Sequence, residues 1–211
     1  MTVTGSTMIA YLHPGVVSHN FMHSMLVTQM HKGNPEHEIV PVRSGPNLFK
    51  SRNSVARKFL ASRHEWLWFV DSDMGFYGNT LENLHVVADP KERPVVGALY
   101  FGQWEEQPDG LGGWRPHKFP QLYDRHGSEY RSWSEWPDNE LVRVDATGTG
   151  CLMIHRNVFK HQIFKKRDWF SPMQDLGEDL AFCRRLEKAR IPIHVHTGIK
   201  TNHHKSVYLT G

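Results

Sequence analysis

The sequence predicts an α/β protein in which helices cover both faces of a mainly parallel sheet. Apolar segments of strand length alternate with segments of helical spacing through the first half of the chain. One of these segments, 66–70 (WLWFV), is hydrophobic at every position, which is typical of a strand covered on both faces. The chain has 211 residues, of which 39% are hydrophobic and 22% charged. The length fits one globular domain, or at most one domain with an appendage, and the composition excludes disordered, collagen-like and coiled-coil chains.

The first predicted strand is 7–12 (TMIAYL), an apolar run that a His-Pro-Gly sequence breaks at 13–15. A helix is expected to begin after Ser18, a good N-cap residue, and to run to about His31. Helical spacing places four apolar residues on one face of it: Phe21, Met25, Leu26 and Met30.

The same alternation continues to residue 101. Strands are predicted at 38–42, 66–70 and 94–101, and helices at 47–62 and 80–88. Right-handed crossovers would make these strands parallel, so their carboxyl ends would share the edge where ligands bind. Three polar segments directly follow strands and should meet there: His13-Pro14, Arg43-Ser44 and Asp71-Ser72-Asp73.

The second half of the chain differs from the first in composition. Residues 103–140 are mostly polar and include four tryptophans, and a hairpin is predicted over 121–133 around His126-Gly127. Further strands are predicted at 141–144, 151–154 and 191–195, with a helix at 176–188.

Composition limits the function. A formal net charge of +3 is too small to indicate a nucleic-acid partner. Two distant cysteines, Cys151 and Cys183, make no disulfide framework, so a reducing cytoplasm is expected. We recognise no signal peptide, and no segment approaches the roughly 20 apolar residues of a membrane-spanning helix.

Asp71-Ser72-Asp73 is the first candidate site. Its two carboxylates end an apolar strand, where burial without a cation would be very costly. A divalent ion would remove that cost, and carboxylate oxygens suit Mg²⁺ or Mn²⁺. The alternative is a solvated turn in which the aspartates cap the next segment.

Four other segments have a structural and a functional interpretation each. Glu178-Asp179 follows Gly177 at a helix start, where acids also serve as caps. Arg52 can reach a phosphate or stay at the surface. The turn at 148–150 lacks the lysine of a P-loop. The tail at 194–204 holds four histidines, with His194 and His196 on one face of a strand.

The order of these segments is more specific than any one of them. Five segments in this order resemble the GT-A glycosyltransferases, and most closely small family 2-like enzymes of bacteria and phages. They span most of residues 7–205 and leave only 103–140 unmatched. The matching segments are SRNSVARKFL, WLWFVDSDMGF, VDATGTGCLMIHR, GEDLAFCRRLEKARIPI and GIKTNHHK.

The resemblance implies a single GT-A domain over 1–211, with a nucleotide-sugar half at 7–101 and an acceptor-binding and catalytic half at 102–211. The donor would be a nucleotide-diphosphate sugar, with UDP or GDP as the nucleotide. The cofactor would be Mn²⁺ or Mg²⁺, and the ion would neutralise the leaving diphosphate.

Site roles follow from the same resemblance. Asp73 would ligate the metal, and Asp71, beside Ser72, would contact the ribose or sugar and stand near the ion. His203 would be a further metal ligand, with His204 as its rival. Three more groups of residues are implied. The nucleoside pocket would be formed by His13, Pro14, Arg43, Ser44 and Arg52, although family members commonly have an acid where this chain has Arg43. The acceptor would lie near Trp104, Asp145, Gly148, Thr149 and Gly150. The base of an inverting reaction would be Asp179, with Glu178 as second choice.

The acceptor would be a glycan or a protein, a virion protein included, and the compartment the cytoplasm, that of the host for a phage protein. A retaining mechanism stays open. One alternative is a nucleotidyltransferase of the same fold, which the absence of Arg and Lys from LHPGVVSHN disfavours. A second is a non-catalytic carbohydrate-binding protein. A third, a zinc hydrolase, lacks the H-E-x-x-H motif.

Overall fold

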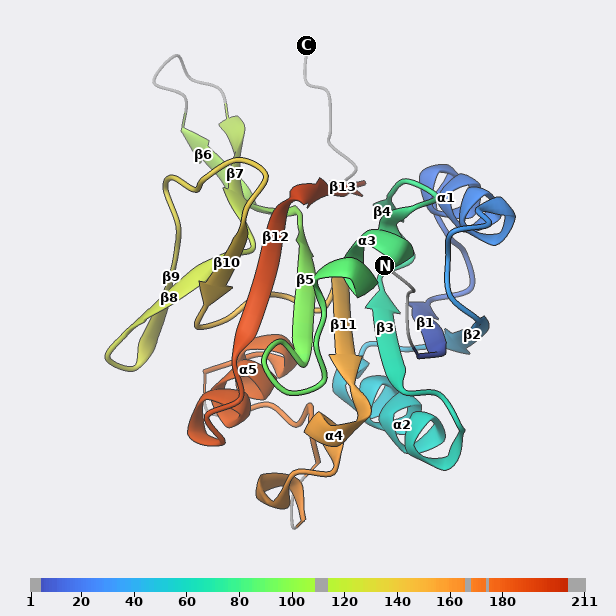
Figure 1. The fold of residues 1–211 in the computed structure, drawn as a ribbon. Helices are drawn as coiled ribbons and strands as arrows, with labels where there is room; N and C mark the ends of the chain where they lie inside the picture. The colour runs from blue at the N-terminus through green and yellow to red at the C-terminus, as the bar shows by residue number, and fades with distance from the viewer. Residues whose placement is uncertain (1–4, 109–113, 166–167, 174, 205–211) are drawn as a thin grey trace.

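A seven-stranded sheet forms the centre of the computed structural model, which describes residues 5–108, 114–165, 168–173 and 175–204. Side chains at 104–108 and 114–116 lie outside the description. In spatial order the strands are β10 (Leu141–Val144), β12 (Ile193–Lys200), β5 (Val95–Leu99), β11 (Cys151–His155), β3 (Trp66–Val70), β1 (Thr7–His13) and β2 (His37–Arg43). β11 and β10 run antiparallel to their neighbours and the other five strands share one direction (Figure 1). The expected mainly parallel sheet is confirmed.

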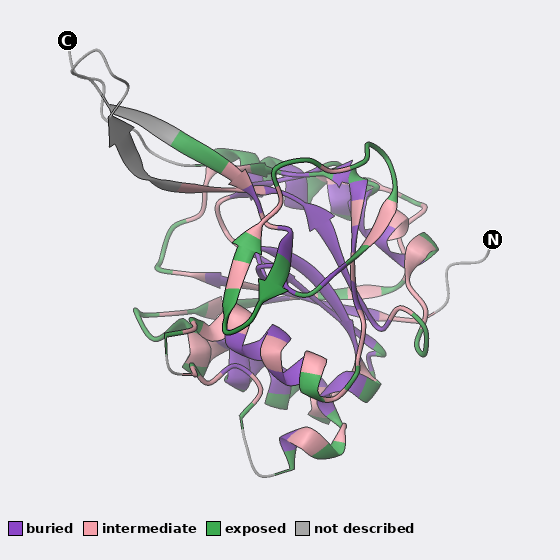
Figure 2. Ribbon diagram, turned by 90° about the vertical axis from the view of Figure 1, so that its left-hand side faces the viewer, coloured by how far each residue is buried: buried purple, intermediate pink, exposed green. Residues whose placement is uncertain are grey.

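Helices cover both faces of this sheet, and each face has its own core. α2 (Leu48–Ala61), α4 (Arg156–Phe159) and α5 (Glu178–Lys188) pack on one face, together with a 3₁₀ turn at Gln162–Phe164. α1 (His19–Met30) and α3 (Thr80–Val87) pack on the other. Buried residues concentrate in the sheet and on the helix faces that touch it (Figure 2).

β3 shows why the sequence folds in this way. Leu67 and Phe69 join the core under α2 and α5, whereas Trp66, Trp68 and Val70 join the core under α1 and α3. Successive side chains of a strand point to opposite faces, so a central strand needs an apolar residue at every position. All five residues of β3 are buried.

One expectation about α1 is wrong. Phe21 and Met25 are buried, but Leu26 and Met30 are 57% and 79% exposed. Leu26 follows Phe21 by five residues, which turns it by about 140° around the helix axis. The side of α1 that faces the sheet is completed instead by two small polar residues, Ser24 and Thr28.

Three two-stranded sheets lie outside the central sheet. The predicted hairpin at 121–133 is confirmed as β8 (Tyr123–His126) and β9 (Glu129–Ser132). The strand predicted over 94–101 divides at Tyr100: β5 stays in the central sheet, and β6 (Phe101–Pro108) leaves it to pair with β7 (Trp114–Pro120).

The third pair joins β4 (Met74–Gly75) to β13 (Asn202–His203), and it was not predicted. The last strand is longer than expected, because β12 continues to Lys200 through a bulge after His196. No helix in the described part of the chain combines the length and apolar character that crossing a bilayer requires.

Candidate active site

The ends of β1, β2 and β3 lie at one edge of the sheet, as the sequence predicted. His13 and Arg43 are partners in the β1–β2 register, and the backbone N–H of Ser44 donates to the carbonyl of His13 (2.9 Å). The Ser44 hydroxyl also donates to Ser51 Oγ (2.9 Å), one residue before Arg52 in α2. Pro14 and Arg43 are exposed beside them.

Arg52 is the centre of the site. Only 2% of it is exposed, and its guanidinium lies over the ring of Phe69 (5.4 Å from the centroid). Its Nη2 donates to Asp71 Oδ1 at 3.2 Å. Its Nε is 3.6 Å from Asp179 Oδ1 and 3.7 Å from Glu178 Oε1, and makes no hydrogen bond to a described residue.

One buried guanidinium therefore joins the first aspartate of the D-S-D segment to the acidic pair of α5. Burial disfavours the charged form of Arg52 and by itself would lower its pKa. The three nearby carboxylates have the larger combined effect, so the pKa of Arg52 is raised. Burial raises the pKa of Asp71 against the opposing effect of Arg52. Burial, and then the charge of Asp179, raise the pKa of Glu178. Negative charge exceeds positive charge here, which favours the binding of a cation.

Thr149 holds Asp179 in place. Its hydroxyl donates to Asp179 Oδ1 (2.6 Å) and its backbone N–H donates to Oδ2 (3.2 Å), so both carboxylate oxygens are engaged. Thr149 is fully buried, whereas Asp179 keeps 29% of its side chain exposed. The carboxylate is thus oriented by the protein and remains open to solvent.

Tyr100 supports the turn at 148–150, and it was not identified as a site residue from the sequence. Its hydroxyl accepts from the backbone N–H of Gly150 (3.0 Å), whose carbonyl in turn accepts from the N–H of Asp71 (2.9 Å). A Cβ on Gly148 would lie 2.0 Å from the Tyr100 hydroxyl oxygen, so only glycine fits there. The sequence signal that could have identified Tyr100 is a polar hydroxyl group near the end of the apolar segment 94–101.

The Asp73 carboxylate contacts His203, which lies in the C-terminal part of the chain. The imidazole Nε2 of His203 lies 3.1 Å from Asp73 Oδ2, and His203 Nδ1 lies 2.9 Å from the carbonyl of Phe101. His204 is exposed, and its backbone N–H donates to the Asp73 carbonyl (2.8 Å). Ser72 is also held by its backbone, since its carbonyl accepts from the N–H of Ser18 (2.9 Å).

Asp73 and His203 offer an oxygen and a nitrogen that could both bind a metal ion. A carbonyl can only accept, so Nδ1 carries the hydrogen that faces Phe101, as in a metal-bound histidine. In neutral His203 the Nε2 lone pair then faces a carboxylate oxygen, an arrangement that needs a proton or a metal ion between them. Adjacent ligands of an octahedral ion, each roughly 2.1 Å from it, lie about 3.0 Å apart. The observed 3.1 Å is the length of an ordinary hydrogen bond or ion pair, and it leaves both atoms close enough to share one ion.

Asp71, two residues before Asp73, accepts from Arg52. Within the described residues, no set of three or more His, Cys, Asp or Glu side chains could hold a metal ion. Mg²⁺-type ions are commonly bound by one or two side chains plus substrate phosphates and water. The Asp73–His203 pair therefore fits an ion that arrives with a phosphorylated ligand.

Some predicted acceptor residues lie apart from these groups. Asp145 is exposed, and its Oδ2 accepts from the N–H of Arg125 in the β8–β9 hairpin (2.8 Å). The Trp104 side chain lies outside the described residues. Trp133 and Trp136 are partly buried against the core, with Trp136 edge-on to Phe101.

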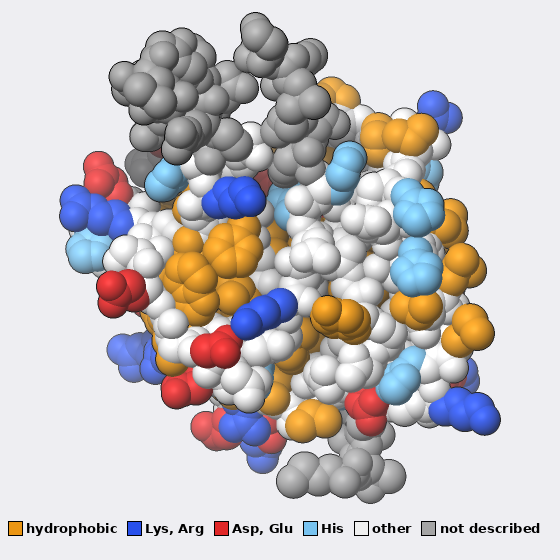
Figure 3. Space-filling view, turned by 90° about the horizontal axis from the view of Figure 1, so that it is seen from above, with side chains coloured by type: hydrophobic (Ala, Val, Ile, Leu, Met, Phe, Trp, Pro, Cys, Tyr) orange, Lys and Arg blue, Asp and Glu red, His pale blue; other side chains and the backbone are white. Residues whose placement is uncertain are grey.

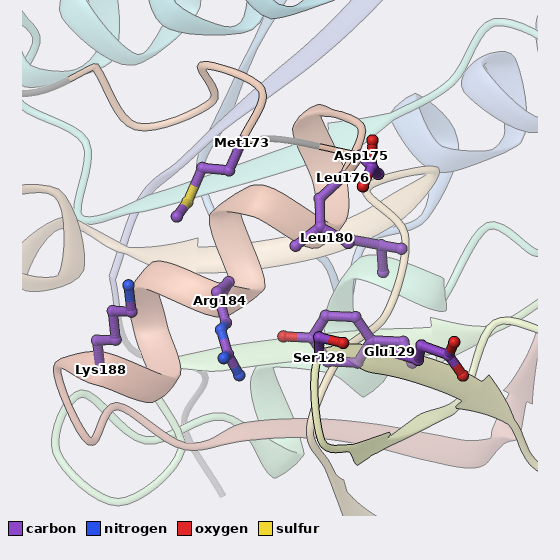
Figure 4. Close-up of a pocket in the computed structure, with 9 residues that line it drawn as sticks. Ser128, Glu129, Met173, Asp175, Leu176, Leu180, Arg184 and Lys188 are labelled. Atoms are coloured by element: carbon purple, nitrogen blue, oxygen red, sulfur yellow. The ribbon is translucent and has the colours of Figure 1, made fainter.

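A hollow of about 780 Å³ lies on the other side of α5, between this helix and the β8–β9 hairpin. Leu180, Arg184 and Lys188 are spaced along one side of α5, with Glu129 of the hairpin across from them (Figure 4). Glu178 and Asp179 do not line it. The two acids of α5 therefore face the sheet edge and not this hollow.

No family model and no curated protein matches the sequence. Two solved structures are similar in fold. The crystal structure of A197 from STIV has a TM-score of 0.64 at 18% identity, covering 95% of this chain and 86% of A197. The crystal structure of GalNAc-T7 with UDP, GalNAc and Mn²⁺ has a TM-score of 0.55 at 9% identity, covering 94% of this chain and 43% of GalNAc-T7. The chain thus spans less than half of GalNAc-T7, and it has the fold of the GT-A glycosyltransferases.

Proposed function

We propose that this protein is a metal-dependent glycosyltransferase, which moves a sugar from a nucleotide-diphosphate donor to an acceptor hydroxyl with inversion. One observation carries the proposal. The Asp73–His203 pair and the acidic pair of α5 converge on the same sheet edge, where Arg52 links Asp71 to the acidic pair. A metal-binding carboxylate and a separate base are the two groups that this reaction needs.

The donor would bind at the ends of β1, β2 and β3. Asp73 and His203 would hold Mn²⁺ or Mg²⁺, which stabilises the departing diphosphate when bound. A nitrogen ligand favours Mn²⁺. The nucleoside would lie against His13, Pro14, Arg43 and Ser44. Arg52 is almost fully buried, so it would act on the donor through Asp71, whose carboxylate it orients.

The acceptor hydroxyl would give its proton to Asp179. Thr149 holds both oxygens of this carboxylate, which sets its direction before the acceptor arrives. Glu178 is the second candidate for the base, in a similar position beside Arg52. The acceptor would be a glycan or a protein lying near Gly148 and Gly150.

The compartment stays an expectation, namely the cytoplasm, that of the host for a phage protein. Cys151 and Cys183 are both free and buried. Burial raises the pKa of each thiol to about 12, so neither is poised for redox chemistry.

The test is donor hydrolysis, since transferases of this kind slowly release nucleoside diphosphate without an acceptor. We would incubate the protein with UDP-, GDP- and dTDP-sugars, UDP-GalNAc included, in Mn²⁺ and then in EDTA. Release should require Mn²⁺ and fall in Asp73→Asn, while Asp124→Asn, an exposed aspartate of β8, keeps the wild-type rate. Release that persists in EDTA and in Asp73→Asn would refute the metal role. No release from any donor would refute the transferase.

A further inference from the structure

A groove separate from these catalytic groups lies between α1 and the β4–β13 pair. Its volume is about 500 Å³, which is ample for a sugar ring. From the geometry we infer that this groove binds a neutral saccharide. Its principal lining side chains are Asn20, His23, Val27, Tyr77, Lys200 and Asn202.

The first observation is an exposed aromatic ring. Tyr77 is 73% exposed, although it directly follows the buried β4 and Phe76. A tyrosine so placed offers an apolar face and a hydroxyl group to the same ligand. The C–H face of a pyranose packs on such a ring, and its hydroxyl groups remain free for polar partners.

The second observation concerns those polar partners. The side chains of Asn20, His23 and Asn202 are exposed and make no hydrogen bond within the described part of the chain. A Cβ on Gly75 would lie 3.2 Å from Asn20 Cβ and 3.6 Å from Asn202 Cβ, so the glycine lets the two amides approach each other. Each amide offers donors and an acceptor, which suits neighbouring sugar hydroxyl groups.

The third observation is that the lining holds no cluster of charged side chains. Lys200 is the one Asp, Glu, Lys or Arg residue among the lining residues, and its Nζ donates to Asp138 Oδ1 (2.8 Å). α1, which forms one wall, contains no Asp, Glu, Lys or Arg. Seen from above, the side of the molecule over α1 shows mainly neutral, histidine and hydrophobic side chains (Figure 3). A phosphate, a nucleic acid or an acidic glycan would find no cationic cluster here.

The groove lies next to the donor edge without sharing its ligands. Gly75 and Asn202 line it, and the β4–β13 pairing also sets Met74 opposite His203. Asp73 and His203 do not line the groove. Saccharide binding here therefore does not depend on the proposed transfer, although a bound glycan would lie close to the donor.

The experiment measures saccharide binding in EDTA and without a nucleotide sugar. Neutral trisaccharides of glucose, galactose, mannose and N-acetylglucosamine would be screened by saturation-transfer NMR, with sialyllactose as a charged comparison. We expect binding of at least one neutral trisaccharide and weaker binding of sialyllactose. Tyr77→Ala should weaken the best binder by about tenfold, and Asn20→Ala by about fivefold. Tyr77→Phe keeps the ring and should bind nearly as well as wild type.

Leu26→Ala is the matched control, because Leu26 is an exposed residue of α1 that does not line the groove. Thermal unfolding would verify that all variants fold. The inference is overturned if no neutral trisaccharide binds, or if Tyr77→Ala and Asn20→Ala bind as well as Leu26→Ala. Saccharide binding without donor hydrolysis would support the saccharide site in the groove and would refute the proposed glycosyltransferase activity.

Discussion

Replacing Arg52 with methionine tests the electrostatic organisation of the site. The side chain of Arg52 is 3% exposed and faces Asp71, Glu178 and Asp179 within 3.2 to 3.7 Å. Methionine fills similar space without charge, so three carboxylates lose the cation that all of them share. Removing one partner of a buried charge network costs about 3–5 kcal/mol. The carboxylates keep 22 to 33% of their side chains exposed, so solvent screening should reduce the loss to just below that range, about 2–3 kcal/mol.

The free energy of unfolding that Arg52→Met loses should also depend on pH. Burial already raises the pKa of Asp71 and Glu178 in the folded protein, and Arg52 opposes that rise. Without Arg52 both values rise further above those of the unfolded chain. A carboxylate with a raised folded pKa contributes stability that is present below its unfolded pKa and is lost as pH rises through the folded pKa. The difference between Arg52→Met and wild type should thus be largest near pH 8 and shrink toward pH 5.

Urea unfolding at pH 8 and pH 5 measures both effects. Arg57→Met is the control: Arg57 lies in the same helix, but it and its partner Asp168 are more than half exposed. Its loss should stay below about 1 kcal/mol with little pH dependence. The reasoning is refuted if Arg52→Met loses no more than Arg57→Met, or loses the same free energy of unfolding at both pH values.

Three other experiments address the catalytic groups and their support. Asp179→Asn should retain donor affinity but lower transfer by roughly 10²–10⁴-fold, with a smaller loss for Glu178→Gln; the reverse order in steady-state kinetics would move the base to Glu178. His203→Gln should weaken calorimetric binding of Mn²⁺–UDP by about 10–100-fold, and unchanged affinity would remove His203 from the metal site. Gly148→Ala places a methyl group against the Tyr100 hydroxyl and should cost about 1–3 kcal/mol of stability. Adding Tyr100→Phe should recover part of the melting temperature, and no recovery would contradict the clash.

The fold class and the strand-end position of the candidate site could be predicted from the sequence. Apolar runs such as Trp66–Val70 are local signals, and the direction of successive crossovers follows from chain chirality, so their carboxyl ends had to meet. The D-S-D segment could therefore be placed at the binding edge without coordinates. The ordered resemblance of five segments added the roles proposed for Asp73, Asp179 and His203.

Side-chain partners across the chain could be decided only by the tertiary structure. Nothing local assigns Asp71 to Arg52, Thr149 to Asp179 or His203 to Asp73, because these contacts join residues 19, 30 and 130 positions apart. The exposure of Leu26 depended in the same way on which side of α1 met the sheet. Helical periodicity identifies faces that residues share, but the packing of the whole chain selects the face that becomes buried.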